Sequence, residues 1–312
     1  MFQLFPVRGW RDASVGVLLI ALLLGLWLPM VFGPLQVYST LCLQVVFFLS
    51  SLQIDIRGIW NEWRAWSTWL LVTLWMLILL PAALFSIVQV IFPDLALPLL
   101  LLAAMPVGMT TPLLAQILRL NGSLALILTL TTSLLAPITV PLLLGLFADP
   151  RYAIEIGHVF LTLFQVIIIP FALAQIVKLF LPGFTRVTKR WYTSSSIILV
   201  GIIIASIAGH YQSALLSRFT FESGLGLLVL MLFFLITHVI GYWIVWWRNE
   251  QDRLTVTFSV VYMNFTLAIF IAEKFFGDPT VIFYTILAIL PWNIGMFFFQ
   301  KVVNHRFSLS TI

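Results

Sequence analysis

The chain is a series of long apolar runs separated by short polar connections. A helix needs about 20 apolar residues to cross the hydrocarbon core of a bilayer. By this rule the sequence predicts ten membrane spans, at residues 14–32, 36–54, 68–92, 95–118, 122–148, 155–181, 192–212, 222–247, 254–276 and 279–302. None of the connections is long or polar enough to form a soluble domain. The predicted fold class is therefore an all-α polytopic membrane protein.

The fourth predicted span contains Pro106, Gly108 and Pro112. Proline supplies no amide donor and clashes with the preceding turn, so this helix must open. Open backbone at membrane depth is tolerated only where it is buried in protein or lines a wet cavity. Hydroxyl side chains gather in the same neighbourhood: Thr110, Thr111, Thr129, Thr131, Thr132 and Ser133. A broken helix facing hydroxyl groups is typical of the midplane binding site of a secondary transporter.

Composition supports the membrane interpretation, because 62% of the residues are hydrophobic, only 9% are charged, and the mean hydropathy is +1.12. A soluble chain carries about 25% charged residues. With the N-terminus inside, only Arg151, Arg218 and Lys274 of the 16 Lys and Arg residues fall on the outer side. This bias predicts that both termini are cytoplasmic, in a cell membrane of the bacterial inner-membrane type. It also accounts for the net charge of +5 without a nucleic-acid partner.

The ten spans divide into two halves, residues 1–150 and 151–312, which together form a single membrane domain. In each half the fourth span carries polar residues, and in the second half these are Ser259, Tyr262, Asn264 and Thr266. Five spans is an odd number, so the halves must lie inverted in the membrane, with broken fourth and ninth helices. Inverted repeats of this kind favour an alternating-access carrier over a channel.

Three sequence motifs show a resemblance to a known family. The run from Pro106 to Pro112 falls on Pro-Gly-Gly-x-x-Ser-Asn, and Leu134-Leu135-Ala136-Pro137 falls on Leu-Leu-Ala-Pro. The run from Ser259 to Ala268 falls on Glu-x-Gly-Met-Gln-Asn-x-x-Leu-Ala and keeps Asn264, Leu267 and Ala268. In these places the chain resembles the bile acid:sodium symporter family. The resemblance implies a ten-span carrier that moves a small organic solute, an organic anion by analogy.

The places where that family holds its coupling sodium ions are changed. They hold Thr111 and Pro112, Ala125 and Thr129, and Ser259 and Met263. Sodium requires several hard oxygen donors, usually with a carboxylate to offset its desolvation. We therefore expect that sodium is not the principal coupling ion, with proton and sodium both left open.

His238, in the middle of the eighth span, is the one titratable group well inside the predicted membrane region. Two interpretations stay open: a neutral imidazole that donates to a carbonyl of a neighbouring helix, or a group that couples protons or contacts solute. The predicted substrate-binding residues are accordingly Thr110, Thr111, Thr129, Ser259, Tyr262, Asn264, Thr266 and His238.

The sequence contains no HExxH, GxSxG or Walker motif and no cluster of Cys and His, so we expect no enzyme activity, cofactor or metal site. Two functions remain. One is a secondary active transporter in the lipid bilayer, and the other is a receptor or sensor that keeps the carrier fold without transport. Accumulation of a solute against its gradient separates them.

Overall fold

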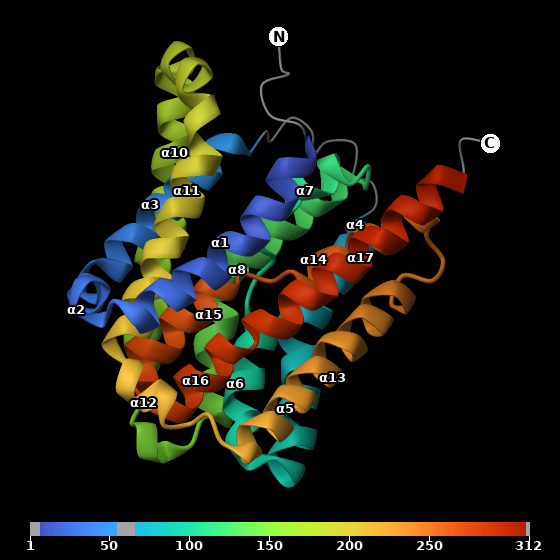
Figure 1. Cartoon of the computed structure of the whole chain (residues 1–312). Coiled ribbons are helices and arrows are strands. Elements are labelled where there is room, and N and C mark those ends of the chain that lie inside the picture. The colour runs from blue at the N-terminus through green and yellow to red at the C-terminus, as the bar shows by residue number, and fades with distance from the viewer. Residues whose placement is uncertain (1–6, 55–65, 310–312) are drawn as a thin grey trace. The chain divides into compact units, whose positions relative to one another are not determined.

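The computed structural model describes residues 7–54 and 66–309, and in these ranges the chain is helical (Figure 1). The described residues contain no strand, and their one isolated β-bridge joins Val107 to Met263. Among them, seven helical stretches are long and apolar enough to cross a membrane: Pro29–Gln53, Trp66–Ile91, Gly122–Phe147, Ile156–Phe180, Pro182–His210, Ser223–Trp243 and Pro279–Arg306. The protein is therefore a multi-pass membrane protein.

The other three predicted spans are also helical, but each is short or interrupted. The apolar part of the first helix is Gly16–Trp27, and residues 95–118 and 254–276 each contain a break. The count of ten spans stays a prediction, because seven of the ten meet the length and apolarity that crossing requires.

The chain folds into two compact units, each of which takes helices from both sequence halves. The first unit comprises the described residues up to Gln53 and Ile169–Phe219. Its helices are α1 (Val7–Trp27), α2 (Pro29–Phe32), the 3₁₀ helix η1 (Gly33–Tyr38), α3 (Ser39–Gln53), α10 (Ile169–Phe180), α11 (Pro182–His210) and α12 (Gln212–Leu216). The compact units therefore do not coincide with the halves 1–150 and 151–312, whose relation as inverted repeats stays a prediction.

Helices α1 and α11 approach closely in the first unit. A Cβ on Gly25 would lie 2.3 Å from the carbonyl oxygen of Ala205, and a Cβ on Gly209 would lie 3.2 Å from the carbonyl oxygen of Gly25. Small residues at such contacts let helix backbones approach in a membrane, where apolar burial against lipid supplies little driving force. The two glycines therefore fix the distance between these helices.

Helix α11 begins at Pro182, ten residues before the predicted start at 192, so that predicted boundary was wrong. Pro182 lies in the first turn of α11, where a missing amide costs nothing. Arg186, Lys189 and Arg190 then occupy the first turns of the helix. An apolarity criterion finds the part of a helix that lipid can surround, and it misses a charged extension of the same helix.

The second unit comprises the described residues of Ile54–Ile168 and Thr220–Ile312. Its first segment holds α4 (Trp66–Leu74), the π-helix η4 (Trp75–Leu79), α5 (Leu80–Ile91), α6 (Pro93–Ala104), α7 (Thr111–Ile117), α8 (Gly122–Phe147), the 3₁₀ helix η5 (Pro150–Tyr152), α9 (Ile156–Leu163) and the π-helix η6 (Phe164–Ile168). Its second segment holds α13 (Phe221–Trp243), α14 (Glu250–Val261), α15 (Phe265–Ile271), the π-helix η7 (Ala272–Phe276), α16 (Pro279–Leu287) and α17 (Ile289–Leu309).

Two of the π-helical turns precede a proline. Pro81 follows η4 and Pro170 follows η6, each two residues after the π-turn ends. A proline ring clashes with the carbonyl four residues earlier, and a π-turn widens the helix at that point. Both helical runs therefore pass their proline without breaking.

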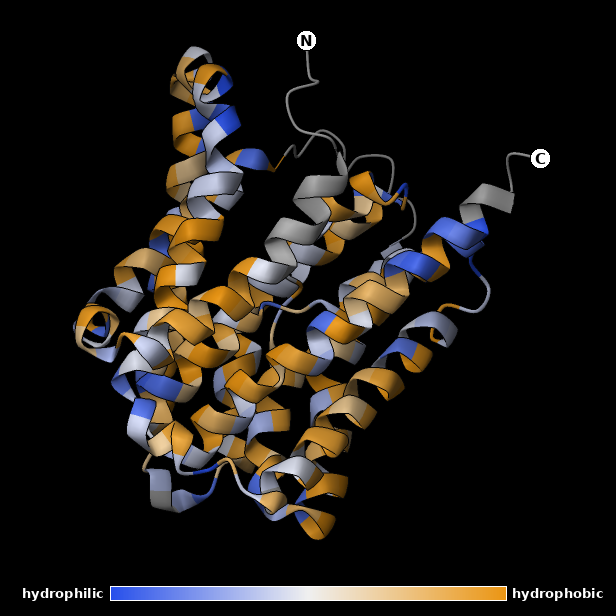
Figure 2. Cartoon of the chain, viewed as in Figure 1, coloured by the Kyte–Doolittle hydropathy of each residue, from blue (hydrophilic) through white to orange (hydrophobic). Residues whose placement is uncertain are grey.

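Hydropathy along the second unit matches the membrane assignment. In Figure 2, α13 and α17 are mostly hydrophobic along their length, and hydrophilic residues gather toward the C-terminal end of α17. Many large apolar side chains on these helices are well exposed, among them Leu228 (62%) and Leu235 (61%). Such surfaces are suited to lipid rather than water.

Candidate functional site

The second unit contains two broken helices of matching dimensions. The first break separates α6, which has 12 residues, from α7, which has 7. The second separates α14, with 12 residues, from α15, with 7. Pro106 lies in the first break as predicted, whereas Pro112 lies in the first turn of α7, where proline is tolerated.

The two breaks pair with each other through their backbones. Val107 and Met263 form an antiparallel bridge. The amide of Gly108 donates to the carbonyl of Tyr262 at 3.0 Å, and the amide of Asn264 donates to the carbonyl of Pro106 at 2.7 Å. Each break thus satisfies polar backbone groups that the other leaves without a helical partner. We call this pairing of residues 105–110 with 262–264 the crossover.

Two hydroxyl groups complete the crossover. Thr132 of α8 accepts a hydrogen bond from the amide of Val107 at 3.1 Å, and Thr111 donates to the carbonyl of Tyr262 at 3.3 Å. Thr132 is fully buried and Thr111 is 2% exposed. Helix α8 therefore contacts the break through Thr132, which lies one turn beyond the predicted Thr129. The hydroxyl of Thr129 instead donates to the carbonyl of Ala125 in its own helix.

Asn264 begins α15 and offers a free donor at the crossover. Its side-chain oxygen accepts from the amide of Leu267 at 3.1 Å and so caps the helix. Its side-chain nitrogen, Nδ2, donates to none of the residues that the structure describes, and the residue is only half-buried. An amide donor held in place by its own oxygen is suited to bind a solute acceptor.

Tyr262 links the crossover to His238. The Tyr262 hydroxyl lies 3.4 Å from Nε2 of His238, and the two rings meet edge to face with centroids 6.0 Å apart. The other ring nitrogen, Nδ1, lies 2.6 Å from the carbonyl of Phe234, one turn back on α13. The ring is thus held by a carbonyl of its own helix, not of a neighbouring helix as the first interpretation of His238 expected, while Nε2 is directed toward Tyr262.

The remaining predicted residues are less directly involved. Ser259 is fully buried and donates to the carbonyl of Thr255 in its own helix at 2.9 Å. Thr266 lies in the first turn of α15 and is 8% exposed, and Thr110 lies half-buried at the start of α7. The structure thus brings Thr111, Tyr262 and Asn264 together directly and adds His238 through Tyr262.

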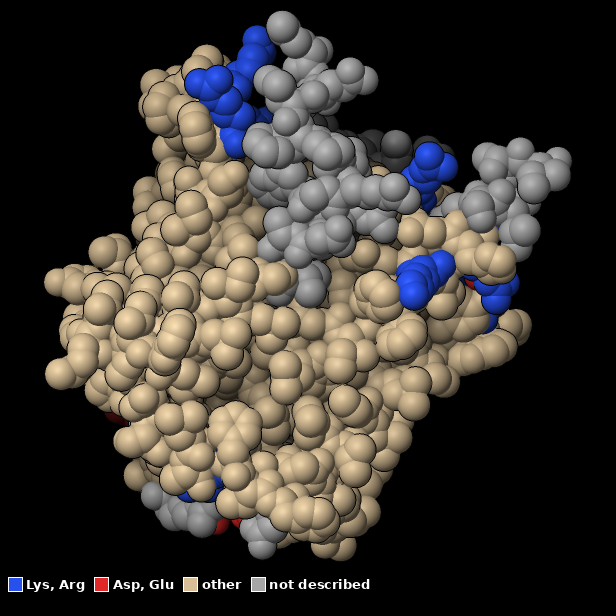
Figure 3. Space-filling view, viewed as in Figure 1, with Lys and Arg blue, Asp and Glu red and all other residues tan. Residues whose placement is uncertain are grey.

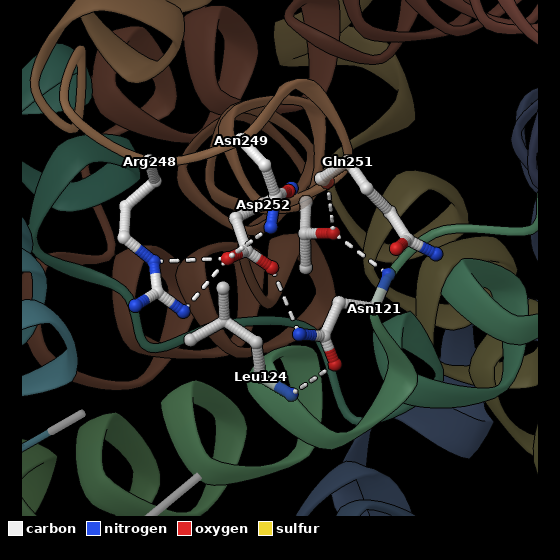
Figure 4. Close-up of polar contacts among 7 residues, drawn as sticks. Asn121, Leu124, Arg248, Asn249, Gln251 and Asp252 are labelled. Atoms are coloured by element: carbon white, nitrogen blue, oxygen red, sulfur yellow. Dashed lines mark hydrogen bonds and ion pairs between the residues drawn. The ribbon is translucent and has the colours of Figure 1, made fainter. Parts of the chain in front are cut away.

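A second polar cluster lies where the turn before α8 meets the loop before α14 (Figure 4). Asp252, 2% exposed, accepts from Asn121 at 2.8 Å and pairs with Arg248 at 2.7 Å. The amide of Asn121 donates to Thr255 at 2.9 Å, and its side-chain oxygen caps α8 through the amide of Leu124. These contacts fasten the start of α8 to the start of α14.

None of the residues of this cluster is among the binding residues predicted from the sequence. Asn249 and Asp252 carry a recognisable signal, because an Asn three residues before a helical Asp is a helix start, and Asn249 indeed accepts from the amide of Asp252 at 2.8 Å. The partner Asn121 lies far away in the sequence, and nothing in its own segment indicates Asp252.

Long apolar helices, two of them broken and paired at the break, define a multi-pass membrane transporter of the bile acid:sodium symporter type. The chain belongs to the SBF-like CPA transporter family, whose sequence model matches residues 12–308. The resemblance inferred from the motifs is therefore confirmed.

One curated relative is similar to part of the chain. It is described as an uncharacterized sodium-dependent transporter, YocS, from Bacillus subtilis (strain 168). The two are 23% identical over 199 residues, which is 62% of this chain and 61% of that relative. The match thus spans about three fifths of either protein.

Proposed function

We propose that the protein is a secondary active transporter of a small organic solute, an organic anion, and that it works by alternating access with the crossover as its solute site. The observation that carries this proposal is the free Nδ2 donor of Asn264 beside two paired helix breaks. Membership of a transporter family supports it. Broken helices that meet near the membrane midplane are a recurring binding-site design in carriers.

The chemistry of the crossover supports an anion over a cation. The runs from Met105 to Thr111 and from Tyr262 to Thr266 contain no Asp or Glu. Their side-chain polar groups are hydroxyls and the Asn264 amide, all of which can donate hydrogen bonds. A buried ion of either sign loses its hydration, and the crossover group without a partner among the described residues is a donor, Nδ2 of Asn264, to which an anion can accept a hydrogen bond.

The matched half-helices support the inverted-repeat architecture. A helix of 12 residues, a break and a helix of 7 residues occur once in residues 1–150 and once in 151–312. In each half the next helix starts at a side-chain cap, Asn121 for α8 and Asp278 for α16. We propose ten spans with both termini cytoplasmic, in a bacterial inner membrane. A reporter fused after Ile312 that is active only outside the cytoplasm would contradict this topology.

We further propose that sodium is not the principal coupling ion. The relative's description as sodium-dependent favours sodium. Against it stand Ser259, Met263 and Pro112, which replace the oxygen-rich side chains that the resemblance leads one to expect. His238, next to Tyr262 of the crossover, is the candidate for proton coupling.

Uptake into proteoliposomes tests the proposed function. Purified protein is first screened with a panel of organic anions, because a solute that binds the native state raises its melting temperature. A solute that gives a shift is then supplied in radiolabelled form outside vesicles that carry an imposed proton or sodium gradient. Accumulation above the external concentration supports a transporter. Binding without accumulation under either gradient would instead identify a receptor.

A further inference from the structure

A groove with a cavity volume of about 540 Å³ lies between α13, α14 and α17 of the second unit. Its long walls are apolar side chains of α13 and α17 that are strongly exposed, including Leu235, Val239 and Phe298 at 61%, 53% and 60%. Both walls belong to helices that are long and apolar enough to cross a membrane, so lipid is the expected neighbour of their exposed side chains. Its volume lies within the roughly 300–1,000 Å³ of small-molecule sites.

The groove has the length of one lipid chain. Its lining on α13 extends from Met231 to Trp243, about 18 Å at roughly 1.5 Å per residue. One leaflet contributes half of the hydrocarbon core, about 15 Å. The groove is thus deep enough for a chain that enters from one leaflet, and short of the full membrane thickness.

One end of the groove is charged. It is lined by Tyr242 and Trp243 at the C-terminal end of α13, by Glu250 at the start of α14, and by Arg306 near the C-terminal end of α17. Arg306 lies 3.8 Å from Glu250, at the limit for an ion pair, and its side chain is 58% exposed. In Figure 3, blue Lys and Arg atoms lie at this end of α17, whereas the surface along the middle of α17 is tan, the colour of uncharged residues.

One further cation adjoins this end. Arg253 stacks on Tyr242, with its guanidinium carbon 3.8 Å from the ring centre, and its buried Nη2 has no hydrogen-bond partner among the described residues. Two arginines, Arg253 and Arg306, and one carboxylate, Glu250, therefore lie around Tyr242, and the end of the groove has an excess positive charge that is complementary to an anion.

We propose that this groove binds one anionic phospholipid, with an acyl chain along α13 and α17 and its phosphate at Arg306. The apolar walls, the depth of one leaflet and the cationic end together fit this occupant, and a basic pocket between membrane helices is a known way to bind anionic head groups. His238 lines the groove and touches Tyr262 of the crossover, so the bound chain packs directly behind the broken helices.

Native mass spectrometry of lipid-stripped protein tests the proposal, with palmitoyl-oleoyl phosphatidylglycerol as the probe and phosphatidylcholine with the same chains as its neutral counterpart. We expect one phosphatidylglycerol to bind at least fivefold more tightly than phosphatidylcholine. Arg306→Gln should weaken phosphatidylglycerol binding about fivefold, the effect of one surface cation on an anionic lipid. Arg190→Gln, which removes an arginine that lies beside Trp191 in the first unit, is the matched control and should bind normally.

Variants that fill the groove test the acyl-chain part. Val239→Trp, and Ile294→Trp on the opposite wall, should reduce binding of both lipids, whereas Leu228→Trp should not, because Leu228 is exposed on α13 but outside the groove. Equal affinity for the two lipids, unchanged binding by both groove-filling variants, or equal loss in Leu228→Trp would overturn the proposal. So would full displacement by glycerol 1-phosphate, because a site for the phosphate alone needs no chain. The assay measures binding without transport, so its result is independent of whether the protein proves to be a carrier.

Discussion

The amide nitrogen of Gly108 donates to the carbonyl oxygen of Tyr262 at 3.0 Å, and a Cβ added to Gly108 would lie 2.9 Å from that same oxygen. The contact that joins the two broken helices therefore requires the absence of a side chain on one of them. The oxygen belongs to the backbone, so it cannot move aside by a rotamer change.

Gly108→Ala should separate the two breaks and destabilise the second unit. Overpacking at a site of this kind costs about 1–3 kcal/mol, so the melting temperature of the purified protein should fall by several degrees. Gly224→Ala is the control, because a Cβ there meets nothing within 4 Å and Ala favours a helix over Gly. An unchanged melting temperature in Gly108→Ala would mean that the crossover is looser than described.

Two substitutions of Asn264 separate its two roles. Serine can cap α15 as asparagine does but lacks the Nδ2 donor, whereas leucine lacks both. We expect both variants to bind the transported solute about 5- to 150-fold more weakly, for a loss of about 1–3 kcal/mol of hydrogen bonding. Isothermal titration with the solute found in the screen would measure this.

Only Asn264→Leu should also lower the melting temperature, because a lost cap costs about 1 kcal/mol. Asn249→Ser is the matched control, since Asn249 caps α14 in the same unit and lies outside the crossover. Normal solute affinity in both Asn264 variants would place the solute site elsewhere.

Asp252→Asn should destabilise the protein without acting on the solute site directly. The change leaves Arg248 without its carboxylate partner at 2.7 Å and replaces an acceptor of the Asn121 amide. Arg248 is 27% exposed, so water compensates part of the loss, and about 1–3 kcal/mol is expected. Thermal unfolding of Glu250→Gln supplies the comparison, because its pair with Arg306 is long and exposed and should contribute less than about 1 kcal/mol.

Replacement of sodium by choline should leave most of the uptake in place, because the crossover has no carboxylate to balance a sodium ion. Uptake that falls to background in choline would show that sodium drives transport.

Uptake driven by an imposed proton gradient should be lost in His238→Gln, which keeps a polar side chain next to Tyr262 but cannot take up a proton.

Because of the Asp278 carboxylate, we expect the stability of the folded protein to depend on pH in the acid range. Burial raises its pKa, but hydrogen bonds from Tyr152 at 2.8 Å and from the amide of Thr280 at 2.7 Å outweigh this, and the net pKa is lowered from 3.8. A lowered pKa in the folded state means stability that is present above pH 3.8 and is lost as the pH falls through the folded-state pKa.

Tyr152→Phe removes one of those hydrogen bonds and keeps the ring that packs edge to face on Phe276 with centroids 5.0 Å apart. The variant should therefore melt below the wild type at neutral pH, and the difference should shrink as the pH is lowered past 3.8. Thermal unfolding at a series of pH values measures it. A difference that stays constant with pH would show that the Tyr152 hydroxyl does not act through Asp278.

Apolar length predicted a chain of helices, and seven of the ten predicted spans meet the requirements for crossing a membrane. Pro106 lies in the first break as predicted, but Pro98, Pro137 and Pro141 lie inside α6 and α8, so a proline alone does not determine where a helix opens. The second break has no proline, and only its polar residues and the family resemblance indicated it. Asn264 ends this break by capping α15, and this role depends on how its side chain is placed in three dimensions.

Pairing between distant segments was not predictable in the same way. Thr129 and Thr132 are equally polar, and the sequence gives no reason to prefer the one that reaches Val107. Asn121 likewise binds Asp252 because two turns meet in space, not because of any local pattern. The grouping of helices into compact units also crosses the sequence halves, since it depends on which faces pack together.

The two hydrogen bonds from Gly108 to Tyr262 and from Asn264 to Pro106 run from main chain to main chain, so they do not depend on the side chains of Val107 and Met263. The resemblance places a glycine and a glutamine at those two positions, and their replacement here has left the junction intact. Because peptide groups hold the two breaks together, side chains at the site can change its chemistry without changing the fold. Ancestral proteins with this junction could exchange their coupling ion or solute by side-chain substitution alone, and a laboratory could redesign the site by the same route.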